Sequence, residues 1–267
     1  MAMVLVLGSA DVGSGVAHAL FQAGHGVALH DISRPAHPRR GMAFTDAFFD
    51  GRCELDGVVA RRARDLEGLA RMLECGRAVP ATDAELPAVV RCVGPGILVD
   101  ARIHKHREPE PIRGIAPIAI GLGPGFEAGG HADVVVETAW GDDLGRVITA
   151  GRARETAGEP RPIEGHARDR YVYSPDDGVF ATKFAIGAIV VAGEPVARVG
   201  DAAILAPLSG VLRGLTRDGV AVRRGMKVVE VDPRGERAFV RGVGERPARI
   251  AAGVLAAIAM RSTPALP

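Results

Sequence analysis

The densest group of side chains that could bind a ligand is the run His104–Arg107, which contains two histidines, a lysine and an arginine. It follows the segment ILVDARI, Ile97–Ile103, which predicts a strand. Ligands of open α/β sheets bind beyond the carboxyl ends of the strands, so the run lies where an anion would be found. Lys105 is expected to contact a phosphate or a carbonyl. A solvated surface charge run is the alternative.

A glycine-rich turn near the amino terminus offers backbone N–H groups to the same kind of ligand. The apolar run Val4–Leu7 predicts a strand, and the pattern Gly8-x-Ala10-x-x-Gly13 follows it, with apolar residues at helical spacing beyond. This is the context of a dinucleotide-binding fingerprint, in which a helix start presents N–H groups to a phosphate. Asp31 ends the next predicted strand, near the position of a ribose-binding acid. The alternative is a similar turn without a ligand.

Charged residues flank this turn. Asp11 would place a carboxylate in the loop, where it either competes with a phosphate for the N–H groups or caps the helix. Arg39 and Arg40 lie in the proline-broken segment SRPAHPRR after the second strand, where guanidinium groups can clamp a phosphate. A solvated loop is the alternative for these two arginines.

A second glycine-rich stretch, IGLGPGFEAGG, follows the apolar run Pro117–Ile120. Gly121, Gly123 and Gly125 allow the main chain to approach another group closely, which favours either a backbone nest for an anion or a tight bend. Glu137 ends the next predicted strand, where it could face a ligand, cap the chain or be solvated.

The alternation of strands and helices predicts an α/β fold with a Rossmann-like parallel sheet over residues 1–162. The carboxyl-terminal half contains an internal repeat: eight residue pairs, from Pro175/Pro207 to Val199/Val231, share one offset of 32. One copy is too small to bury its apolar face, so the two copies are expected to intertwine.

The repeat is similar to the half-motif of biotinyl/lipoyl domains, which implies a β-rich barrel-sandwich domain over residues 163–240. Those carriers hold a modified lysine between the halves, but the join here, VGDAAIL, has none, so a docking or lid module is expected. Residues 241–267 contain the apolar run Ile250–Met260, which predicts a helix packed on the core or on a second subunit and is too short to span a bilayer.

Composition narrows the function classes. The formal net charge of +1 over 267 residues argues against a nucleic-acid partner. Cys53, Cys75 and Cys92 are widely spaced and odd in number, which indicates buried inert thiols in a reducing compartment, and the amino terminus has no signal-peptide pattern. We therefore expect a cytoplasmic protein with no membrane partner, and His104 and His106 are not metal ligands by spacing alone.

Taken in order, eight blocks of the chain resemble one bacterial family: VLGSADVGSGVAHAL, RPAHPRRGMAF, VDARIHKHR, IGLGPGFEAG, VVVETAWGDDLGRVI, APLSGVLRGL, KVVEVDPRGE and IAAGVLAAI. This family is the YqeB-type proteins of the selenium-dependent molybdenum hydroxylase system, which are relatives of the XdhC accessory proteins. The resemblance implies that the matching residues form a cofactor site: Gly8, Asp11, Gly15, Arg39, Arg40, Asp100, Lys105, Gly121, Gly123, Gly125 and Glu137.

The same resemblance implies a role in the maturation of molybdenum hydroxylases. The chain would bind the molybdenum cofactor, as molybdopterin or its dinucleotide, and its partners would be the apoenzyme or other maturation proteins. Whether it turns over a substrate stays open. The residues leave two alternatives: an NAD(P)-dependent oxidoreductase, which Asp31 would support, and a non-enzymatic docking module.

Overall fold

The computed structural model describes residues 1–105, 107–155 and 160–262. The chain divides into two compact units. The first contains Met1–Ser33, Ala43–Gly158 and Val243–Pro267, and the second contains Arg34–Met42 and Glu159–Gly242. This division differs from the predicted boundaries, because the carboxyl-terminal helix belongs to the first unit and Arg34–Met42 belongs to the second.

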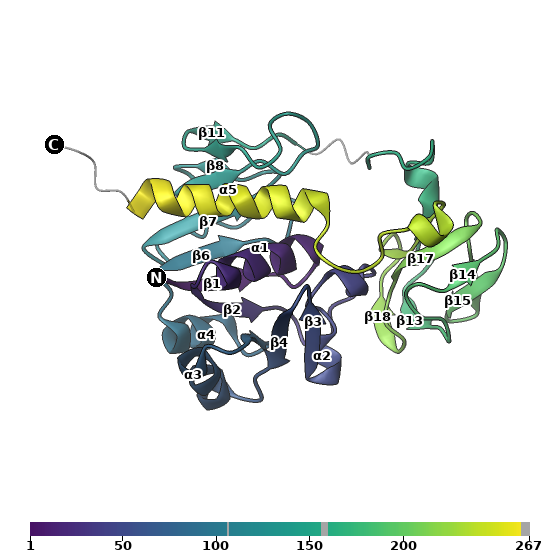
Figure 1. Ribbon diagram of the computed structural model, residues 1–267, viewed down its shortest axis with the longest axis horizontal. Coiled ribbons are helices and arrows are strands. Elements are labelled where there is room, and N and C mark those ends of the chain that lie inside the picture. The colour runs from purple at the N-terminus through teal and green to yellow at the C-terminus, as the bar shows by residue number, and fades with distance from the viewer. Residues whose placement is uncertain (106, 156–159, 263–267) are drawn as a thin grey trace. The chain divides into compact units, whose positions relative to one another are not determined.

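A nine-stranded mixed sheet forms the centre of the first unit (Figure 1). Its strand order is β10-β9-β7-β6-β1-β2-β5-β4-β3. The seven strands from β9 to β4 in this order are parallel to their neighbours, whereas β3 and β10 pair antiparallel at the two edges. The strands are β1 (Met3–Leu7), β2 (Gly26–His30), β3 (Arg52–Leu55), β4 (Val58–Arg62), β5 (Val79–Thr82), β6 (Ile97–Asp100), β7 (Ile118–Leu122), β9 (Val134–Val136) and β10 (Val147–Ile148).

Helices cover both faces of this sheet. Successive strand residues point to opposite faces, so Val4 and Val6 pack with one set of helices and Leu5 and Leu7 with the other. The first set is α1 (Asp11–Gln22), α2 (Ala47–Asp50) and α5 (Glu245–Ser262), and the second is α3 (Leu66–Cys75) and α4 (Leu86–Val93). Helices α1 and α5 lie side by side in Figure 1. A two-stranded sheet of β8 (Glu127–Ala128) and β11 (Gly151–Arg152) completes the unit.

The second unit is built from two four-stranded antiparallel sheets, ordered β12-β19-β17-β14 and β16-β15-β13-β18. Its strands are β12 (Tyr171–Tyr173), β13 (Gly178–Ala181), β14 (Ile189–Val190), β15 (Pro195–Val199), β16 (Ala202–Leu205), β17 (Gly210–Leu215), β18 (Val220–Val222) and β19 (Lys227–Asp232). Single-turn 3₁₀ helices are Arg40–Met42, Arg168–Arg170 and Gly235–Arg237.

The two copies of the repeat exchange strands. Strand β13 of the first copy pairs with β18 of the second, and β17 of the second copy pairs with β14 of the first. The registers Gly178↔Val222 and Gly210↔Val190 are the same pairing displaced by the repeat offset. Each copy therefore completes a sheet of the other, which buries the shared core around Phe180 and Leu212.

The predicted fold class is wrong in both of its parts. A Rossmann-like parallel sheet needs helical crossovers, but β3 and β10 are antiparallel, and no helix occurs among the described residues between β6 and β7 or between β7 and β9. The second unit is a pair of separate antiparallel sheets, with β12 added from outside the repeat, in place of a biotinyl/lipoyl-like barrel. The strand, turn and helix pattern holds for β1, α1 and β2, and the prediction extended it to segments that connect differently.

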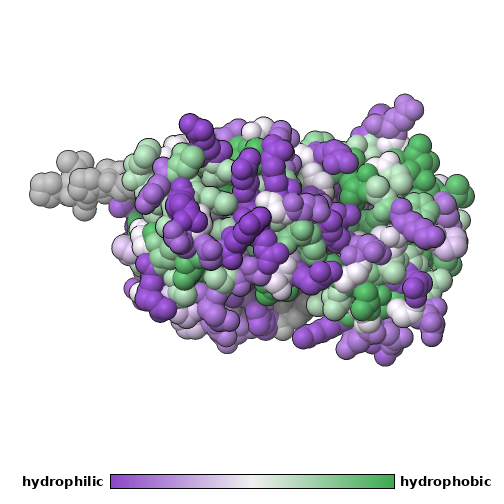
Figure 2. Space-filling view, turned by 90° about the horizontal axis from the view of Figure 1, so that it is seen from below, coloured by the Kyte–Doolittle hydropathy of each residue, from purple (hydrophilic) through white to green (hydrophobic). Residues whose placement is uncertain are grey.

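No helix within the described ranges combines the length and the apolar character needed to cross a bilayer. On the face of the molecule shown in Figure 2, hydrophilic residues are distributed over the surface and mixed with smaller apolar patches.

Candidate functional site

The parallel strands of the first unit bring several predicted site residues to one edge of the large sheet. Asp100, the last residue of β6, lies between Leu7 of β1 and Gly121 of β7 in the strand register. The residues that follow β2 and β9, Asp31 and Glu137, leave the sheet at the same edge, because these strands run parallel. The structure therefore brings three of the predicted site residues, Asp31, Asp100 and Glu137, to one edge of the sheet.

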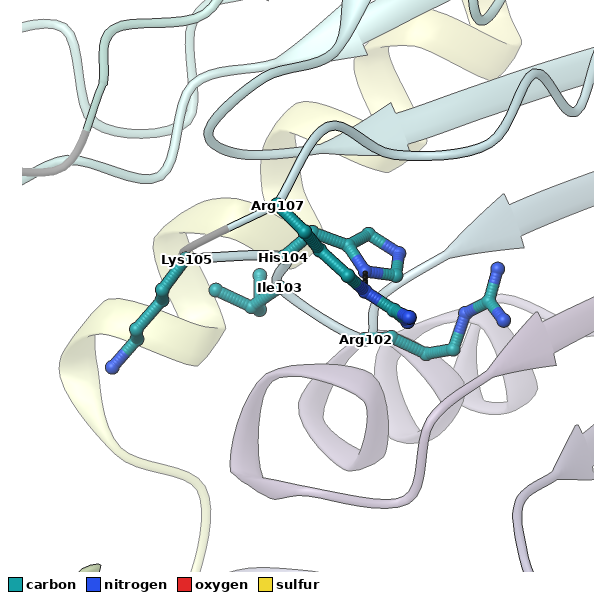
Figure 3. A pocket seen from close by; sticks show the side chains of 5 residues that line it. All are labelled: Arg102, Ile103, His104, Lys105 and Arg107. Atoms are coloured by element: carbon teal, nitrogen blue, oxygen red, sulfur yellow. Dashed lines mark hydrogen bonds between the residues drawn. The ribbon is translucent and has the colours of Figure 1, made fainter. Parts of the chain in front are cut away.

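A shallow cavity of about 380 Å³ lies directly beyond Asp100. It is lined by Arg102, Ile103, His104, Lys105 and Arg107, and no acidic residue is among these lining residues (Figure 3). In Figure 3 the side chain of Arg107 lies across His104, whereas Lys105 extends from the other side of the loop. The lining is therefore cationic, as the run at this position predicted, and His106 lies outside the described residues.

Asp100 is buried and holds this loop in place. Its carboxylate accepts hydrogen bonds from the Arg102 side chain, with Nε at 3.0 Å and Nη2 at 2.5 Å, and from the Arg102 backbone N–H at 3.0 Å. The Nε2 of His104 lies 3.3 Å from the same carboxylate, and its Nδ1 accepts a hydrogen bond from Arg107 Nε at 3.1 Å. Because Nδ1 is an acceptor, Nε2 carries the proton and donates to Asp100.

The charges of this network follow from its contacts. Burial raises the pKa of Asp100, but the hydrogen bonds from His104 and Arg102 outweigh it and lower the pKa to about 2. The hydrogen bond to Asp100 in turn raises the pKa of Arg102. Asp100 is therefore ionised at neutral pH and fixes a charged guanidinium at the mouth of the cavity, which still has donors beyond this pair because a guanidinium carries five N–H groups.

The first glycine turn is closed by groups of the protein itself. The N–H of Gly8 donates to the His30 carbonyl at 2.8 Å. The N–H and the hydroxyl of Ser9 both donate to Asp31 Oδ2, at 2.6 and 2.7 Å, and Asp31 Oδ1 accepts from the next N–H in the chain. A Cβ on Gly13 would lie 1.9 Å from the Gly8 carbonyl oxygen, so Gly13 allows the helix start to pack on the turn. Asp31, which was predicted to bind a ribose, thus accepts the hydrogen bonds that hold the turn together.

Two further residues of the predicted set have local roles in α1. Asp11 lies in the first turn of the helix, and its Oδ1 accepts a hydrogen bond from the Val12 N–H at 3.1 Å. Gly15 faces α5, where a Cβ would lie 2.7 Å from the Cβ of Pro247. Gly15 therefore allows the two helices to approach closely.

The second glycine loop is a bend packed against the protein's own side chains. A Cβ on Gly121 would lie 2.4 Å from the ring of Phe126, and a Cβ on Gly123 would lie 2.4 Å from Thr138 Oγ1. A Cβ on Gly125 would lie 2.7 Å from Pro109, and Phe126 is fully buried. A tight bend accounts for these contacts, and the three glycines, which the resemblance assigns to the cofactor site, are not among the residues that line the cavity.

Glu137 is buried and serves as an acceptor for its own loop. Its Oε1 accepts the N–H groups of Thr138 and Ala139 at 2.7 and 2.8 Å, and its Oε2 accepts the N–H of Arg154 at 2.8 Å. Three backbone donors therefore occupy this carboxylate, which positions the chain after β9.

Arg39 and Arg40 belong to the second unit and do not line the cavity. Arg39 forms a bidentate ion pair with Glu230, with Nε at 2.6 Å and Nη2 at 3.1 Å. Arg40 Nε donates to the Leu215 carbonyl at 2.9 Å. The arginines expected beside Lys105 are thus held by contacts within their own unit.

The sequence interpretation did not single out Arg102 or the linkage of Asp100, Arg102 and His104. Arg102 and His104 follow Asp100 by two and four residues, and the chain turns back toward the carboxylate because β6 ends at Asp100 and Ile103 has a left-handed φ of 52°. The short spacing of a carboxylate, an arginine and a histidine was the available signal, but the prediction of one strand over Ile97–Ile103 gives Arg102 no role.

Metal and thiol chemistry have little support in the described part of the chain. No group of three or more His, Cys, Asp or Glu side chains there could hold a metal ion. The three cysteines are free, and Cys75 is exposed, so the prediction of buried thiols is wrong for this residue. Burial raises the pKa of Cys53 to about 12, so its thiol is unreactive at neutral pH.

These features define a two-unit α/β protein with a cationic cavity at the carboxyl edge of parallel strands. No family model matches the chain. It is 36% identical over 258 residues to the uncharacterized protein YqeB of Escherichia coli K12, an alignment that covers 97% of this chain and 47% of YqeB. The predicted resemblance to YqeB is thereby confirmed. It spans about half the length of this relative.

Similar solved structures are distant. The apo form of the ectoine utilization protein EutE (DoeB) from Ruegeria pomeroyi is 14% identical, with 87% of this chain and 86% of that chain covered and a TM-score of 0.26. An aspartoacylase family protein from Mesorhizobium loti is 10% identical, with 88% and 87% covered and a TM-score of 0.27. TM-scores this low support no conclusion about the fold or activity of this chain.

Proposed function

We propose that the chain is an accessory protein in the maturation of molybdenum hydroxylases and that it binds a phosphate-bearing part of the molybdenum cofactor in the cavity of Arg102, Lys105 and Arg107. The observation that carries this proposal is the presence of three cations, Arg102, Lys105 and Arg107, among the five residues that line a cavity at the carboxyl edge of parallel strands. The resemblance that suggests this role extends over nearly the whole chain, as does the alignment with YqeB.

The residues present fit the anionic end of such a cofactor. Arg102 and Arg107 supply guanidinium groups, which bind phosphate oxygens in pairs, and Lys105 supplies a point charge. A volume of about 380 Å³ is near the lower limit for ligand pockets, so it would accommodate the phosphate-bearing end of a dinucleotide rather than the whole molecule.

In this role the chain's own residues bind and orient. The buried Asp100 fixes Arg102 directly and Arg107 through His104, so two cations are arranged before a ligand arrives. The cofactor would supply redox chemistry to the enzyme that receives it, and this chain would hold its phosphate. The proposed setting is the cytoplasm, with the apoenzyme or another maturation protein as the partner.

The test is mass spectrometry of small molecules released on denaturation from protein isolated freshly from a cofactor-producing host. We expect a molybdopterin species from the unaltered chain. Lys105→Ala should weaken retention by about 1.5–3 kcal/mol, about 10- to 150-fold, if the ammonium makes a charge-assisted contact. Arg91→Ala is the matched control, because Arg91 is an exposed arginine of the same unit on α4, outside the cavity lining.

Three outcomes would contradict the proposal. Release of no pterin or nucleotide would favour a docking module, and release of NAD(P) together with hydride transfer would favour the oxidoreductase. Equal retention in Lys105→Ala and Arg91→Ala would exclude the cavity as the site even if a pterin were released.

A further inference from the structure

A second cavity lies at the opposite edge of the large sheet, where the parallel strands begin. It has a volume of about 700 Å³, within the range of sites for small molecules, and is open to solvent. Its lining consists of residues 113–117, which lead into β7, and Asp133, which directly precedes β9. Because β7 and β9 run parallel, both lining segments meet at the amino edge of the sheet.

The protein holds the guanidinium group of Arg113 in place at this cavity. Its Nε donates to Asp133 Oδ1 at 2.9 Å, and its Nη1 donates to the Gly129 carbonyl. Asp133 Oδ2 accepts the Ala119 N–H at 2.9 Å, which connects the carboxylate to β7. Arg113 Nη2 has no hydrogen-bond partner among the described residues, so an ordered guanidinium keeps donors for a ligand.

The charges at this edge of the sheet are not balanced. Arg261, near the end of α5, donates from Nη2 to the Asp133 carbonyl oxygen at 2.9 Å. Two guanidinium groups therefore lie beside one carboxylate. Neither arginine pairs with another carboxylate within the described ranges, so the three side chains have a surplus of one positive charge. This surplus favours a monovalent anion.

Backbone donors of the same segment add to the attraction for an anion. The N–H groups of Gly114 and Ala116 have no acceptor in the part of the chain that the structure describes. Gly114 has a φ of 80°, and a Cβ there would meet nothing within 4 Å, so the turn is open on that side. Ala116 is buried, and an unpaired N–H in a buried residue is costly, which points to an acceptor supplied by a ligand.

One wall of the cavity is apolar. Ile115 is 37% exposed, and it belongs to neither apolar cluster of the first unit. Its side chain therefore does not contribute to the packing of the core. An isoleucine that lines a cavity beside a fixed cation would contact the alkyl part of a ligand whose charged end binds the cation.

We propose that this cavity binds a small aliphatic carboxylate. Arg113 Nη2 and the N–H groups of Gly114 and Ala116 bind the two carboxylate oxygens, and Ile115 contacts the alkyl chain. Asp133 positions Arg113. Each oxygen of Asp133 accepts one hydrogen bond and has capacity for another, so the same cavity accommodates the ammonium group of an amino acid.

The test is an NMR titration of the full chain, labelled with ¹⁵N, at neutral pH and constant ionic strength. The probes are isovalerate, its neutral amide isovaleramide and leucine, and sodium chloride is the control. The backbone amide signals of Gly114 and Ala116 report on the cavity. We expect isovalerate to shift both signals to saturation and isovaleramide to bind at least about tenfold more weakly, because the amide lacks the charge.

Arg113→Met should weaken the binding of isovalerate by about tenfold or more, since a hydrogen bond to a charged group contributes at least about this factor. Arg91→Met is the matched control, because Arg91 is an exposed arginine of the same unit on α4, outside the cavity lining. Its affinity for isovalerate should stay within about twofold of the unaltered chain.

Ile115→Ser is the second variant, and it keeps the test valid if Arg113→Met fails to fold by circular dichroism. It should weaken the binding of isovalerate by about fivefold, because the contact with the alkyl chain is lost. Ile32→Ser, at an exposed isoleucine of the same unit outside the cavity lining, should have an effect of less than about twofold.

Tighter binding of leucine than of isovalerate would identify an amino acid as the ligand, and the reverse would identify a carboxylic acid without an ammonium group. Both results support the site. Shifts no larger than those caused by chloride would overturn the proposal, and so would equal affinities for isovalerate and isovaleramide or equal losses in Arg113→Met and Arg91→Met. The two cavities share no lining residue and the probes contain no phosphate, so failure of the cofactor proposal would leave these results unchanged.

Discussion

Asp100 determines the geometry of the first-unit cavity, because donors from two side chains converge on its buried carboxylate. Arg102 is held directly, and His104 connects Asp100 to Arg107. Arg102 and Arg107 are exposed cations of the cavity lining, so their arrangement depends on this one buried anion.

Replacement of Asp100 by asparagine should destabilise the protein by about 2 kcal/mol at pH 7, because the pKa of Asp100 is lowered from 3.8 to about 2. A depressed carboxyl pKa stabilises the folded state above the unfolded pKa. This contribution is therefore lost as the pH falls from about 4 to about 2, so the difference between the two proteins should disappear over that range. Urea unfolding at several pH values measures it, and a difference that is constant with pH would contradict the assignment.

The bend at Gly121 offers a second residue-scale prediction. Gly121→Ala should destabilise the protein by about 1–3 kcal/mol, because the new Cβ would lie 2.4 Å from the buried Phe126 ring. Gly96→Ala is the control, because its Cβ would meet nothing nearer than the Met3 carbonyl oxygen at 3.8 Å. Thermal unfolding of both variants provides the comparison, and equal effects would mean that the loop is not packed as described.

At the scale of elements, the repeat explains how short strands form a core. Neither copy closes a sheet alone, and the exchange of β14 and β18 supplies each copy with its missing neighbour. The two copies differ where β17 meets β19, since the second copy has a bulge and a set of charges that the first lacks.

Equivalent glycines of the two copies should differ in their tolerance of a side chain. A Cβ on Gly210 would lie 2.3 Å from the Asp232 carbonyl oxygen, whereas a Cβ on Gly178 would lie 2.8 Å from a methyl group of Val199. A side chain can rotate away but the backbone of β19 cannot, so Gly210→Ala should cost about 1–2 kcal/mol more than Gly178→Ala. Urea unfolding measures both, and a larger loss for Gly178→Ala would refute the packing argument.

At the scale of the whole molecule, the chain forms two units with separate cores. One large sheet divides the apolar residues of the first unit into two clusters, and the second unit has a cluster of its own. Each unit also contains one group of cations around a buried acid, Asp100 in the first and Glu230 in the second. Asp100 and Glu230 therefore belong to units with different apolar cores.

Amide hydrogen exchange should distinguish the effect of replacing Asp100 on the first unit from the effect of replacing Glu230 on the second unit. Asp100→Asn is expected to speed amide exchange in β6 by about tenfold or more and to leave β19 unchanged, and Glu230→Gln should do the reverse, because local stability follows local contacts. Exchange measured by NMR on Val99 and Val229 reports the two units. Acceleration of both strands by either variant would show that the units unfold together.

Much of the local structure could be predicted from the sequence, because it depends on neighbours along the chain. Periodicity located β1, α1, β2 and β6, and the constant offset of 32 revealed the repeat. The charged residues of the run His104–Arg107 indicated a binding region beyond β6, and His104, Lys105 and Arg107 line the cavity there. The wrong fold class came from assigning one parallel Rossmann-like sheet to all of residues 1–162, whereas β3 and β10 are antiparallel and no helix joins β7 to β9 among the described residues.

Composition and spacing determined where strands, turns and charges lie along this chain, since these depend on local preference and hydrophobic period. Only the tertiary structure decided what each group contacts. Arg39 forms an ion pair with Glu230, which lies 191 residues away in the sequence, and the ring of Phe126 packs against the bend at Gly121. Asp31 and Glu137 accept hydrogen bonds from backbone N–H groups of the protein itself. Such pairings depend on the packing of segments distant in sequence, which local patterns do not encode.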